Sequence, residues 1–307
     1  METRRLGGDG PVVSVVGLGC NNFGMKIDAD ASREVVHAAL DAGITHFDTA
    51  EMYGGGHSEE FLGAALGARR EEVVIASKFV PRPAEPPYEP GALRARIVEG
   101  CEISLSRLGT DRIDLYYQHY PDTHAPVDEA LEALDDLVRQ GKVRHVASSN
   151  VDAAQIDEAA KVAADRGFPR FAGTQIEWNL LERGVEAEVV PAARRNSVGI
   201  VPYFPLASGM LTGKYRKGEE YPEGSRFTMM GGYFAKIATD ENFARVDELT
   251  GFAAARGHSV LELAVAWLAA QDGVASVIAG ATTAEQVRAN AAGADWVLTP
   301  EDLAAIR

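Results

Sequence analysis

Four side chains in the first half of the sequence have the types and the spacing that proton transfer requires. Asp48, Lys78 and His119 each stand at the end of an apolar, strand-like run, and Tyr53 follows Asp48 after one short turn. A phenol can give a proton to an oxygen, and a neighbouring ammonium favours the phenolate that remains. A carboxylate can keep the ammonium charged, and an imidazole can hydrogen-bond the accepting oxygen. We therefore interpret the four residues as parts of one site.

The reaction that fits these groups is the reduction of a carbonyl by hydride. Hydride addition at carbon leaves negative charge on oxygen, and a positioned acid must neutralise it. A free tyrosine has a pKa near 10, so Tyr53 needs help to exchange its proton near neutral pH. Lys78 would lower that pKa, with each unit worth about 1.4 kcal/mol, and Asp48 would orient Lys78. His119 would orient the substrate, and no metal is required.

The elements that must position these groups follow a repeated pattern of a short β-branched run, a polar turn and an amphipathic helix. The expected strands are Val16–Leu18, Ile44–Phe47, Val73–Ser77, Ile113–Gln118, Val143–Ala147, Gly173–Ile176, Gly199–Tyr203 and Val274–Ile278. The expected helices begin near Ala31, Ser58, Pro90, Val127, Asp152 and Glu186, within Asn242 to Ser259, and near Ala284. Ser58 and Asp152 are expected to cap the helices that follow them.

This alternation predicts parallel strands with helical crossovers, closed into a (β/α)8 TIM barrel that spans 1–307 as one domain. An open, doubly wound sheet is the alternative. It usually has a glycine-rich phosphate fingerprint at its first strand–helix turn, and the glycine spacing of Gly17–Gly24 does not fit. In a barrel the active site lies at the carboxyl ends of the strands, where Asp48, Lys78 and His119 are expected.

Two segments depart from the repeat. Thr3–Leu6 and Pro11–Val15 read as a β-hairpin that caps the amino-terminal end of the barrel. The long, glycine-rich stretch Leu206–Tyr233 follows a strand end and is a candidate lid over the catalytic end.

Composition sets the outer limits. The net charge of −15 and the isoelectric point near 4.9 argue against a nucleic-acid or anionic-membrane binder. No apolar run reaches transmembrane length, and the amino terminus has no apolar signal core. The sequence has only two cysteines, Cys20 and Cys101, so a disulfide framework is not expected. The expected location is the reducing cytoplasm. A homo-oligomer is left open.

These residues resemble the aldo-keto reductase family, in particular its branch of potassium-channel β-subunit-like proteins. Gly43–Gly54 looks like the first family signature, and Ala76–Lys78 and Asp114–Asp122 look like the next two. The resemblance extends from Leu18 to about Asn290. It implies a catalytic tetrad of Asp48, Tyr53, Lys78 and His119, with Tyr53 as the acid and a nicotinamide cofactor as the hydride donor.

The resemblance also implies where the nicotinamide end of the cofactor binds. Ser149, Asn150 and Gln175 match positions that hydrogen-bond the carboxamide. Trp178 stands where an aromatic residue, usually tyrosine, stacks on the nicotinamide ring. An indole can serve the same purpose, although it departs from the usual residue.

The phosphate-binding segments match less evenly. The stretch 203–214 resembles the pyrophosphate loop, with expected contacts from Tyr203, Phe204, Leu206, Ser208, Gly209, Leu211 and Lys214. Phe204 replaces a serine that commonly binds phosphate, which leaves backbone amides and Lys214 as donors. The adenosine-phosphate end is expected at Gly280, Thr282, Gln286 and Asn290. Many NADP-preferring relatives carry a basic residue there, and Arg288 is the one nearby; NADPH is the predicted cofactor and NADH the alternative.

Three other functions are weighed. His46 and Asp48, with further histidines, suggest a metal-dependent hydrolase, but the positive charge of Lys78 would oppose a cation at that point. A non-enzymatic, redox-sensing regulatory protein would also bind the cofactor, although an intact tetrad favours an enzyme. A Schiff-base aldolase would use Lys78 as nucleophile. For a reductase, aldehydes, sugar carbonyls and small ketones are all open as substrates.

Overall fold

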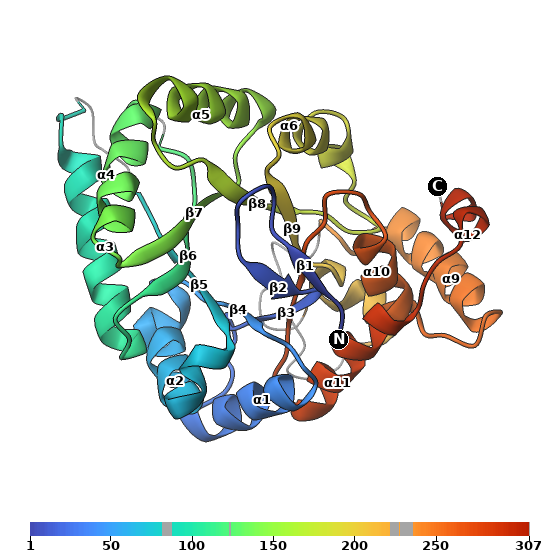
Figure 1. Cartoon of the computed structure of the whole chain (residues 1–307). Helices are drawn as coiled ribbons and strands as arrows, with labels where there is room; N and C mark the ends of the chain where they lie inside the picture. Colours follow the sequence, from blue (N-terminus) through green and yellow to red (C-terminus); the bar gives the residue numbers. More distant parts are fainter. Residues whose placement is uncertain (82–87, 123, 222–226, 228–235, 307) are drawn as a thin grey trace.

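The sequence alternation folds into a ring of parallel strands surrounded by helices (Figure 1). The computed structural model describes residues 1–81, 88–122, 124–221, 227 and 236–306. The eight-stranded sheet has the order β10-β3-β4-β5-β6-β7-β8-β9. Its strands are β3 (Val16–Gly19), β4 (His46–Asp48), β5 (Val74–Phe79), β6 (Ile113–Gln118), β7 (Val143–Ser149), β8 (Phe171–Glu177), β9 (Gly199–Tyr203) and β10 (Val277–Gly280).

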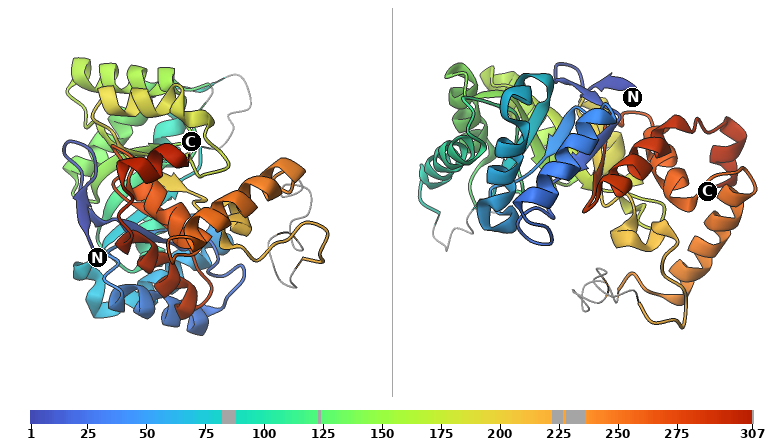
Figure 2. Two further views of the ribbon diagram at one scale, coloured as in Figure 1. Left: turned by 90° about the vertical axis from the view of Figure 1, so that its right-hand side faces the viewer. Right: turned by 90° about the horizontal axis from the view of Figure 1, so that it is seen from below.

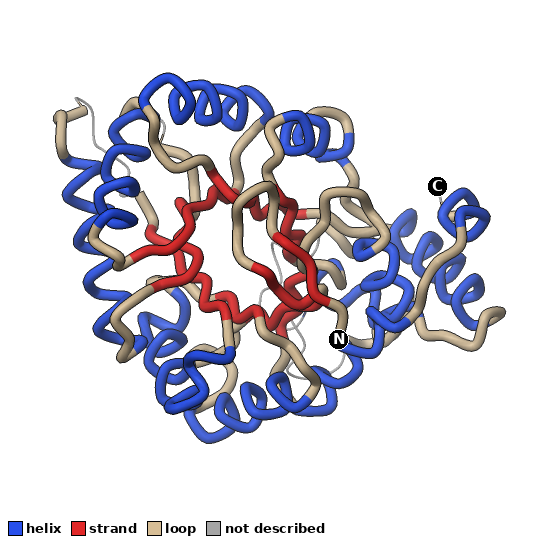
Figure 3. Tube along the Cα trace, in the orientation of Figure 1, coloured by secondary structure: helices blue, strands red, loops and turns tan. Residues whose placement is uncertain are grey.

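The edges of this sheet meet at a parallel bridge between Ile200 and Val274, so the strands form the ring seen in Figure 3. The last strand was expected at Val274–Ile278 but lies at Val277–Gly280. Val274 pairs with β9 on one side, and only after it does the chain turn to pair with β3. The (β/α)8 barrel predicted from the sequence is confirmed.

Helices cover the outer surface of the ring (Figures 1 and 2). They are α1 (Ala29–Asp41), α2 (His57–Leu66), α3 (Ala92–Leu108), α4 (Val127–Arg139), α5 (Ala153–Arg166), α6 (Val189–Arg195), α10 (Val260–Ala269) and α11 (Ala284–Ala292). Two further helices, α9 (Asp240–Ala254) and α12 (Pro300–Ala305), lie outside this layer, with α9 packed against α10. The Asp152 cap of α5 is confirmed, since its side chain accepts from the backbone of Gln155 in a capping box. Ser58 is not a cap: it lies inside α2 and is buried, and its hydroxyl donates to the carbonyl of Cys20.

The predicted hairpin, β1 (Thr3–Arg5) with β2 (Val12–Ser14), crosses one end of the barrel (Figure 1). Its Leu6 is fully buried and packs with side chains from inside the ring. Leu6 fits because Gly173 and Gly199 lack side chains; a Cβ on Gly199 would lie 2.6 Å from a Leu6 methyl carbon. The Arg4 guanidinium ties the hairpin to the carbonyls of Ala269 and Val274 at 2.6 and 3.0 Å.

Candidate active site

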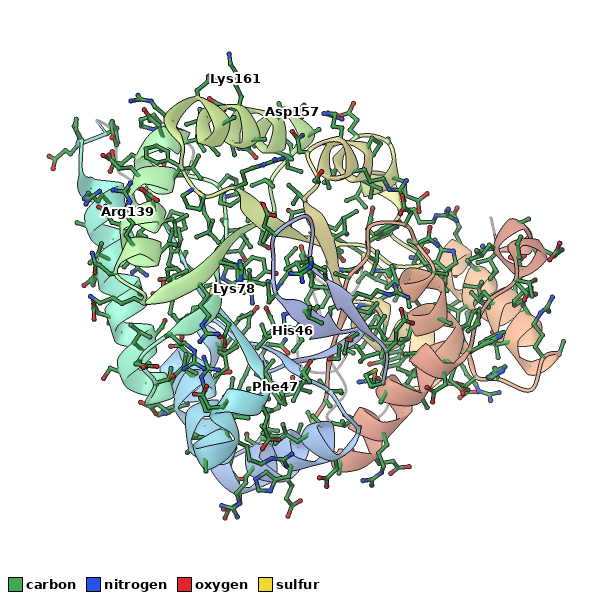
Figure 4. The ribbon with its side chains drawn as sticks, viewed as in Figure 1. His46, Phe47, Lys78, Arg139, Asp157 and Lys161 are labelled. Carbon is green, nitrogen blue, oxygen red and sulfur yellow. The ribbon has the colours of Figure 1, made fainter. Side chains whose placement is uncertain are left out.

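The centre of the site is Lys78, near the carboxyl end of β5 and completely buried. Figure 4 shows Lys78 within the ring of strands, in contrast to Lys161, which projects outward from α5. The Lys78 Nζ atom donates to Asp48 Oδ1 at 2.6 Å and to the carbonyl of Thr49 at 2.8 Å. Asp48 ends β4, the neighbouring strand, so the parallel pairing itself brings this ion pair together.

Tyr53 presents its hydroxyl to the same ammonium. The Tyr53 Oη atom lies 3.5 Å from Lys78 Nζ, and that nitrogen lies 4.9 Å from the centroid of the phenol ring. The phenol and the amine therefore point into one region, as the predicted chemistry requires.

His119 completes the group. Its ring centroid lies 5.7 Å from that of Tyr53, in an edge-on arrangement. Its backbone is fixed on both sides: the His119 N–H donates to the carbonyl of Phe79 at 3.0 Å, and its own carbonyl accepts from Asn150 Nδ2 at 2.9 Å. Among the described residues, the buried Nδ1 atom of His119 has no hydrogen-bond partner. The structure brings the four predicted residues into one cluster.

Burial and charge act against each other on Tyr53 and Lys78. Burial raises the pKa of Tyr53 above its usual value, and the lowering by Lys78 only partly offsets this rise. Lys78 does lower the pKa of Tyr53, as expected from the sequence. Burial raises that pKa by more, so the net direction is upward. Burial also acts to lower the pKa of Lys78, but attraction to Asp48 and Tyr53 outweighs it and the net direction is upward. The amine therefore stays charged near neutral pH.

His119 is neutral near neutral pH. Burial, with the Lys78 charge as the second cause, lowers the pKa of His119 to about 3. A neutral imidazole can still donate one hydrogen bond to a carbonyl oxygen without carrying charge into the site.

Because two buried histidines have lowered pKa values, we expect the protein to lose stability in mild acid. Burial lowers the pKa of His46 to about 4 and that of His119 to about 3. The unfolded chain takes up protons on both residues near pH 6.5 and the folded chain does not, so falling pH favours unfolding. We expect each histidine to reduce the free energy of unfolding by about 2 kcal/mol between pH 7.5 and 5. Urea unfolding at the two pH values measures this change, and His119→Gln should remove half of the contribution that His46 and His119 make together.

The three predicted carboxamide contacts, Ser149, Asn150 and Gln175, lie next to the cluster, on β7, just past β7 and on β8. Gln175 Nε2 donates to Asp48 Oδ2, and the Ser149 hydroxyl donates to the Gln175 carbonyl at 3.2 Å. Asn150 has a left-handed backbone, with φ of 59°. Its Oδ1 atom accepts from the Tyr203 hydroxyl of β9 at 2.8 Å. These polar groups therefore form a connected wall beside the proton-transfer residues.

Trp178 lies differently from the sequence-based expectation. Its side chain is 2% exposed, its ring packs edge-on against Trp267, and its indole N–H donates to Glu186 at 3.0 Å. Both faces of the indole are covered by protein, so it has no open face for a nicotinamide ring. The half-buried Tyr203, bonded to Asn150, is the aromatic residue of this wall.

The predicted pyrophosphate loop follows β9 and has an unusual backbone. Phe204, Ala207, Ser208 and Gly209 all have positive φ, at 50°, 44°, 57° and 102°. Within this turn the Ala207 and Gly209 backbone N–H groups donate to the carbonyls of Phe204 and Leu206, at 2.9 and 2.8 Å. The Ser208 hydroxyl is buried and has no partner among the described residues, so it could donate to a phosphate oxygen. Of the other predicted contacts, Leu206 is half-buried, Leu211 is buried and Lys214 is exposed.

The predicted adenosine-phosphate residues lie at the end of β10 and the start of α11. The Thr282 backbone N–H and hydroxyl both donate to Gln286 Oε1, at 2.8 and 3.1 Å. Gly280 is exposed, Asn290 is buried, and Arg288 is exposed on α11. The candidate lid Leu206–Tyr233 lies partly outside the described residues.

The geometry offers little to a metal ion. Within the described part of the chain, no three histidine, cysteine or acidic side chains form a group that could hold one. His46 Nδ1 bonds Ser276 at 3.0 Å, while Asp48 is engaged by Lys78 and Gln175. In the same part of the chain, no helix is both long and apolar enough to span a membrane.

Sequence reasoning missed two contacts at the centre of the site. The Thr49 backbone carbonyl accepts from Lys78, and Gln175 donates to Asp48 through its Nε2 atom. No residue type signals a backbone acceptor. The position of Gln175 near the end of β8, on the same barrel edge as Asp48, was the one available indication.

The fold and the site together define a (β/α)8-barrel protein with a buried lysine–carboxylate pair, a tyrosine and a histidine at the carboxyl end of its strands. Comparison with known proteins gives the family. The model of the aldo/keto reductase family matches residues 15–307. This chain therefore belongs to the aldo/keto reductase family, whose members carry out nicotinamide-dependent oxidoreduction of carbonyls.

Several curated relatives cover nearly the whole chain. It is 36% identical to the "Probable voltage-gated potassium channel subunit beta" of Oryza sativa subsp. japonica, over 98% of this chain and 94% of the relative. It is 36% identical to the aldo-keto reductase YhdN of Bacillus subtilis, over 98% of this chain and 91% of the relative. It is 32% identical to the L-glyceraldehyde 3-phosphate reductase of Escherichia coli strain K12, over 94% of this chain and 86% of the relative.

Proposed function

We propose that this protein is an NADPH-dependent carbonyl reductase in which Tyr53 is the general acid. The observation that carries the proposal is the position of Lys78 Nζ, which lies 2.6 Å from Asp48 and 3.5 Å from the Tyr53 hydroxyl. That arrangement supplies a proton donor, the half-buried Tyr53, beside a fixed and fully buried positive charge.

The roles follow from the geometry. A bound reduced nicotinamide supplies the hydride. Tyr53 gives its proton to the carbonyl oxygen, and the Lys78 ammonium stabilises the phenolate that remains. Asp48 holds Lys78 charged, while neutral His119 orients the carbonyl by a hydrogen bond. Burial keeps Tyr53 protonated until the oxygen has gained charge, which suits an acid in the reductive direction.

The cofactor residues are proposed from three features of the structure. Ser149, Asn150 and Gln175 form the polar wall beside Asp48, with Tyr203 as its aromatic member. The left-handed turn at Ser208 and its unpartnered hydroxyl suit a phosphate. The exposed side of α11 suits the adenosine end.

The proposal is tested by oxidation of NADPH and NADH in the presence of aldehydes, ketones and sugars. We expect turnover with at least one carbonyl class and faster turnover with NADPH. Tight NADPH binding without turnover across the whole panel would instead support the non-enzymatic, redox-sensing alternative. Two relatives are named as probable voltage-gated potassium channel subunits.

Arg288 is the predicted source of NADPH preference. It is exposed on α11, close in sequence to Gln286 and Asn290, and can form a charge-assisted hydrogen bond to a 2′-phosphate. We expect Arg288→Ala to weaken NADPH binding roughly tenfold and to leave NADH binding unchanged. Fluorescence titration of both cofactors measures the difference. Equal loss for the two cofactors, or tighter binding of NADH by the unaltered protein, would contradict the assignment.

A further inference from the structure

The turn that carries Tyr53 is built from the least restrained residues in a protein chain. This segment, residues 49–56 and hereafter the Tyr53 turn, ends in Gly54, Gly55 and Gly56, all with positive φ at 57°, 67° and 103°. Glycine loses more conformational entropy on folding than any other residue. A phenol that must reach an ammonium 3.5 Å away therefore needs an external restraint.

Arg107 provides contacts at both ends of this turn. It lies in the last turn of α3, which packs beside α2 outside the barrel (Figure 1). Its Nη1 atom donates to the Glu51 carbonyl at 2.8 Å, before Tyr53. After Tyr53, its guanidinium lies against Gly56, where a Cβ would be only 2.5 Å from Cζ. One side chain thus touches the residues that flank the phenol.

Arg107 is itself held by a buried carboxylate. Arg107 Nη1 lies 3.3 Å from Glu59 Oε2, and the Glu59 side chain is completely buried. The other oxygen of Glu59 accepts from the Ser77 hydroxyl at 2.6 Å. Ser77 directly precedes Lys78 on β5. The contacts therefore join the Tyr53 turn to the strand that carries the partner of Tyr53.

Glu51 anchors the turn a second time. Its backbone N–H donates to the Lys78 carbonyl at 3.2 Å, and its Oε1 accepts from the Val80 N–H at 2.7 Å. The same carboxylate pairs with Arg96, also on α3. Two arginines of one helix thus hold the turn through Glu51, but only Arg107 also contacts Gly56 and Glu59.

We propose that Arg107 is a positioning residue that keeps the Tyr53 hydroxyl within reach of Lys78 by holding the Tyr53 turn at both ends. The inference rests on the proposed function, because it concerns the geometry of the acid. A guanidinium suits this task since its planar donors contact a carbonyl and a carboxylate at fixed angles. A lysine offers a flexible point charge and replaces only part of this geometry.

The test compares Arg107→Met, Arg107→Lys and the double variant Arg107→Met with Glu59→Gln, which avoids leaving a buried carboxylate unpaired. Arg94→Met is the matched control, because Arg94 lies on the same helix and pairs with Asp136 away from the turn. We expect kcat for carbonyl reduction to fall 10- to 100-fold in Arg107→Met and the double variant, with the NADPH dissociation constant within twofold. Arg107→Lys should recover part of the loss, and Arg94→Met should match the unaltered protein.

Hydrogen exchange followed by mass spectrometry separates the two proposals, since it needs no turnover. Peptides covering residues 49–60 should exchange faster in Arg107→Met than in Arg94→Met. Unchanged exchange, unchanged kcat, or parallel loss of kcat and cofactor affinity would each overturn the positioning role. An unaltered protein without any turnover would refute the carbonyl reductase, yet faster exchange in the variant would still show that Arg107 holds the turn.

Discussion

Tyr53→Phe is expected to lower kcat for carbonyl reduction by about 10²- to 10⁴-fold, the usual contribution of a positioned acid. The substitution removes one oxygen and leaves the ring that packs edge-on against His119 at 5.7 Å. The hydroxyl that is lost is the proposed proton donor, 3.5 Å from the Lys78 ammonium. Steady-state kinetics with a carbonyl found in the substrate screen measures the loss.

Cofactor binding separates an effect on chemistry from a collapse of the site. The Tyr53 hydroxyl contacts Lys78 and none of the proposed cofactor residues, so the NADPH dissociation constant should change less than twofold. Tyr116→Phe is a suitable control, because Tyr116 is a buried tyrosine that packs against Phe79 away from the ammonium. Near-normal turnover in Tyr53→Phe would remove Tyr53 from the role of acid.

The barrel and the tetrad were accessible from the sequence because both depend on a simple rule of topology. Parallel strands with helical crossovers put all their carboxyl ends on one edge, so three polar residues that follow strand-like runs must converge. Asp48, Lys78 and His119 do so without any long-range information beyond the strand count. The Tyr53 position follows from the short length of its turn.

Trp178 and Ser58 show where local sequence is insufficient. The family resemblance implied ring stacking for Trp178, and the local pattern suggested helix capping for Ser58. The partners that decide otherwise, Trp267 and the Cys20 carbonyl, are distant in sequence. A short stretch of sequence does not show which residues from distant parts of the chain will pack against a side chain, so it does not fix the role of that side chain.

For a related reason, the sequence could not predict whether the pKa of Tyr53 lies above or below its usual value. A sequence names the charges that approach the phenol but not the depth of its burial. Here the desolvation of Tyr53 exceeds the favourable field of Lys78. The same burial strengthens every interaction of the Lys78 ammonium once the carbonyl oxygen gains charge. The raised pKa and the proposed acid role are thus compatible, because an acid must hold its proton until the oxygen becomes basic.

Lys78→Met is the second substitution with a large expected effect, and it acts on both activity and stability. Lys78 is fully buried and pairs with Asp48 at 2.6 Å. Removing the ammonium leaves the buried carboxylate of Asp48 without its charge partner, which costs about 3–5 kcal/mol. The phenolate of Tyr53 also loses its stabilising charge, so we expect kcat to fall by about 10²- to 10³-fold. Urea unfolding and steady-state kinetics measure the two losses.

The double variant Asp48→Asn with Lys78→Met separates these two effects. It removes both charges, so no unpaired ion remains buried, and much of the lost stability should return. Activity should not return, because the phenol still lacks a neighbouring positive charge. Recovery of turnover together with stability would mean that the ion pair only maintains the fold, and the proposed assistance of Tyr53 by Lys78 would then be refuted.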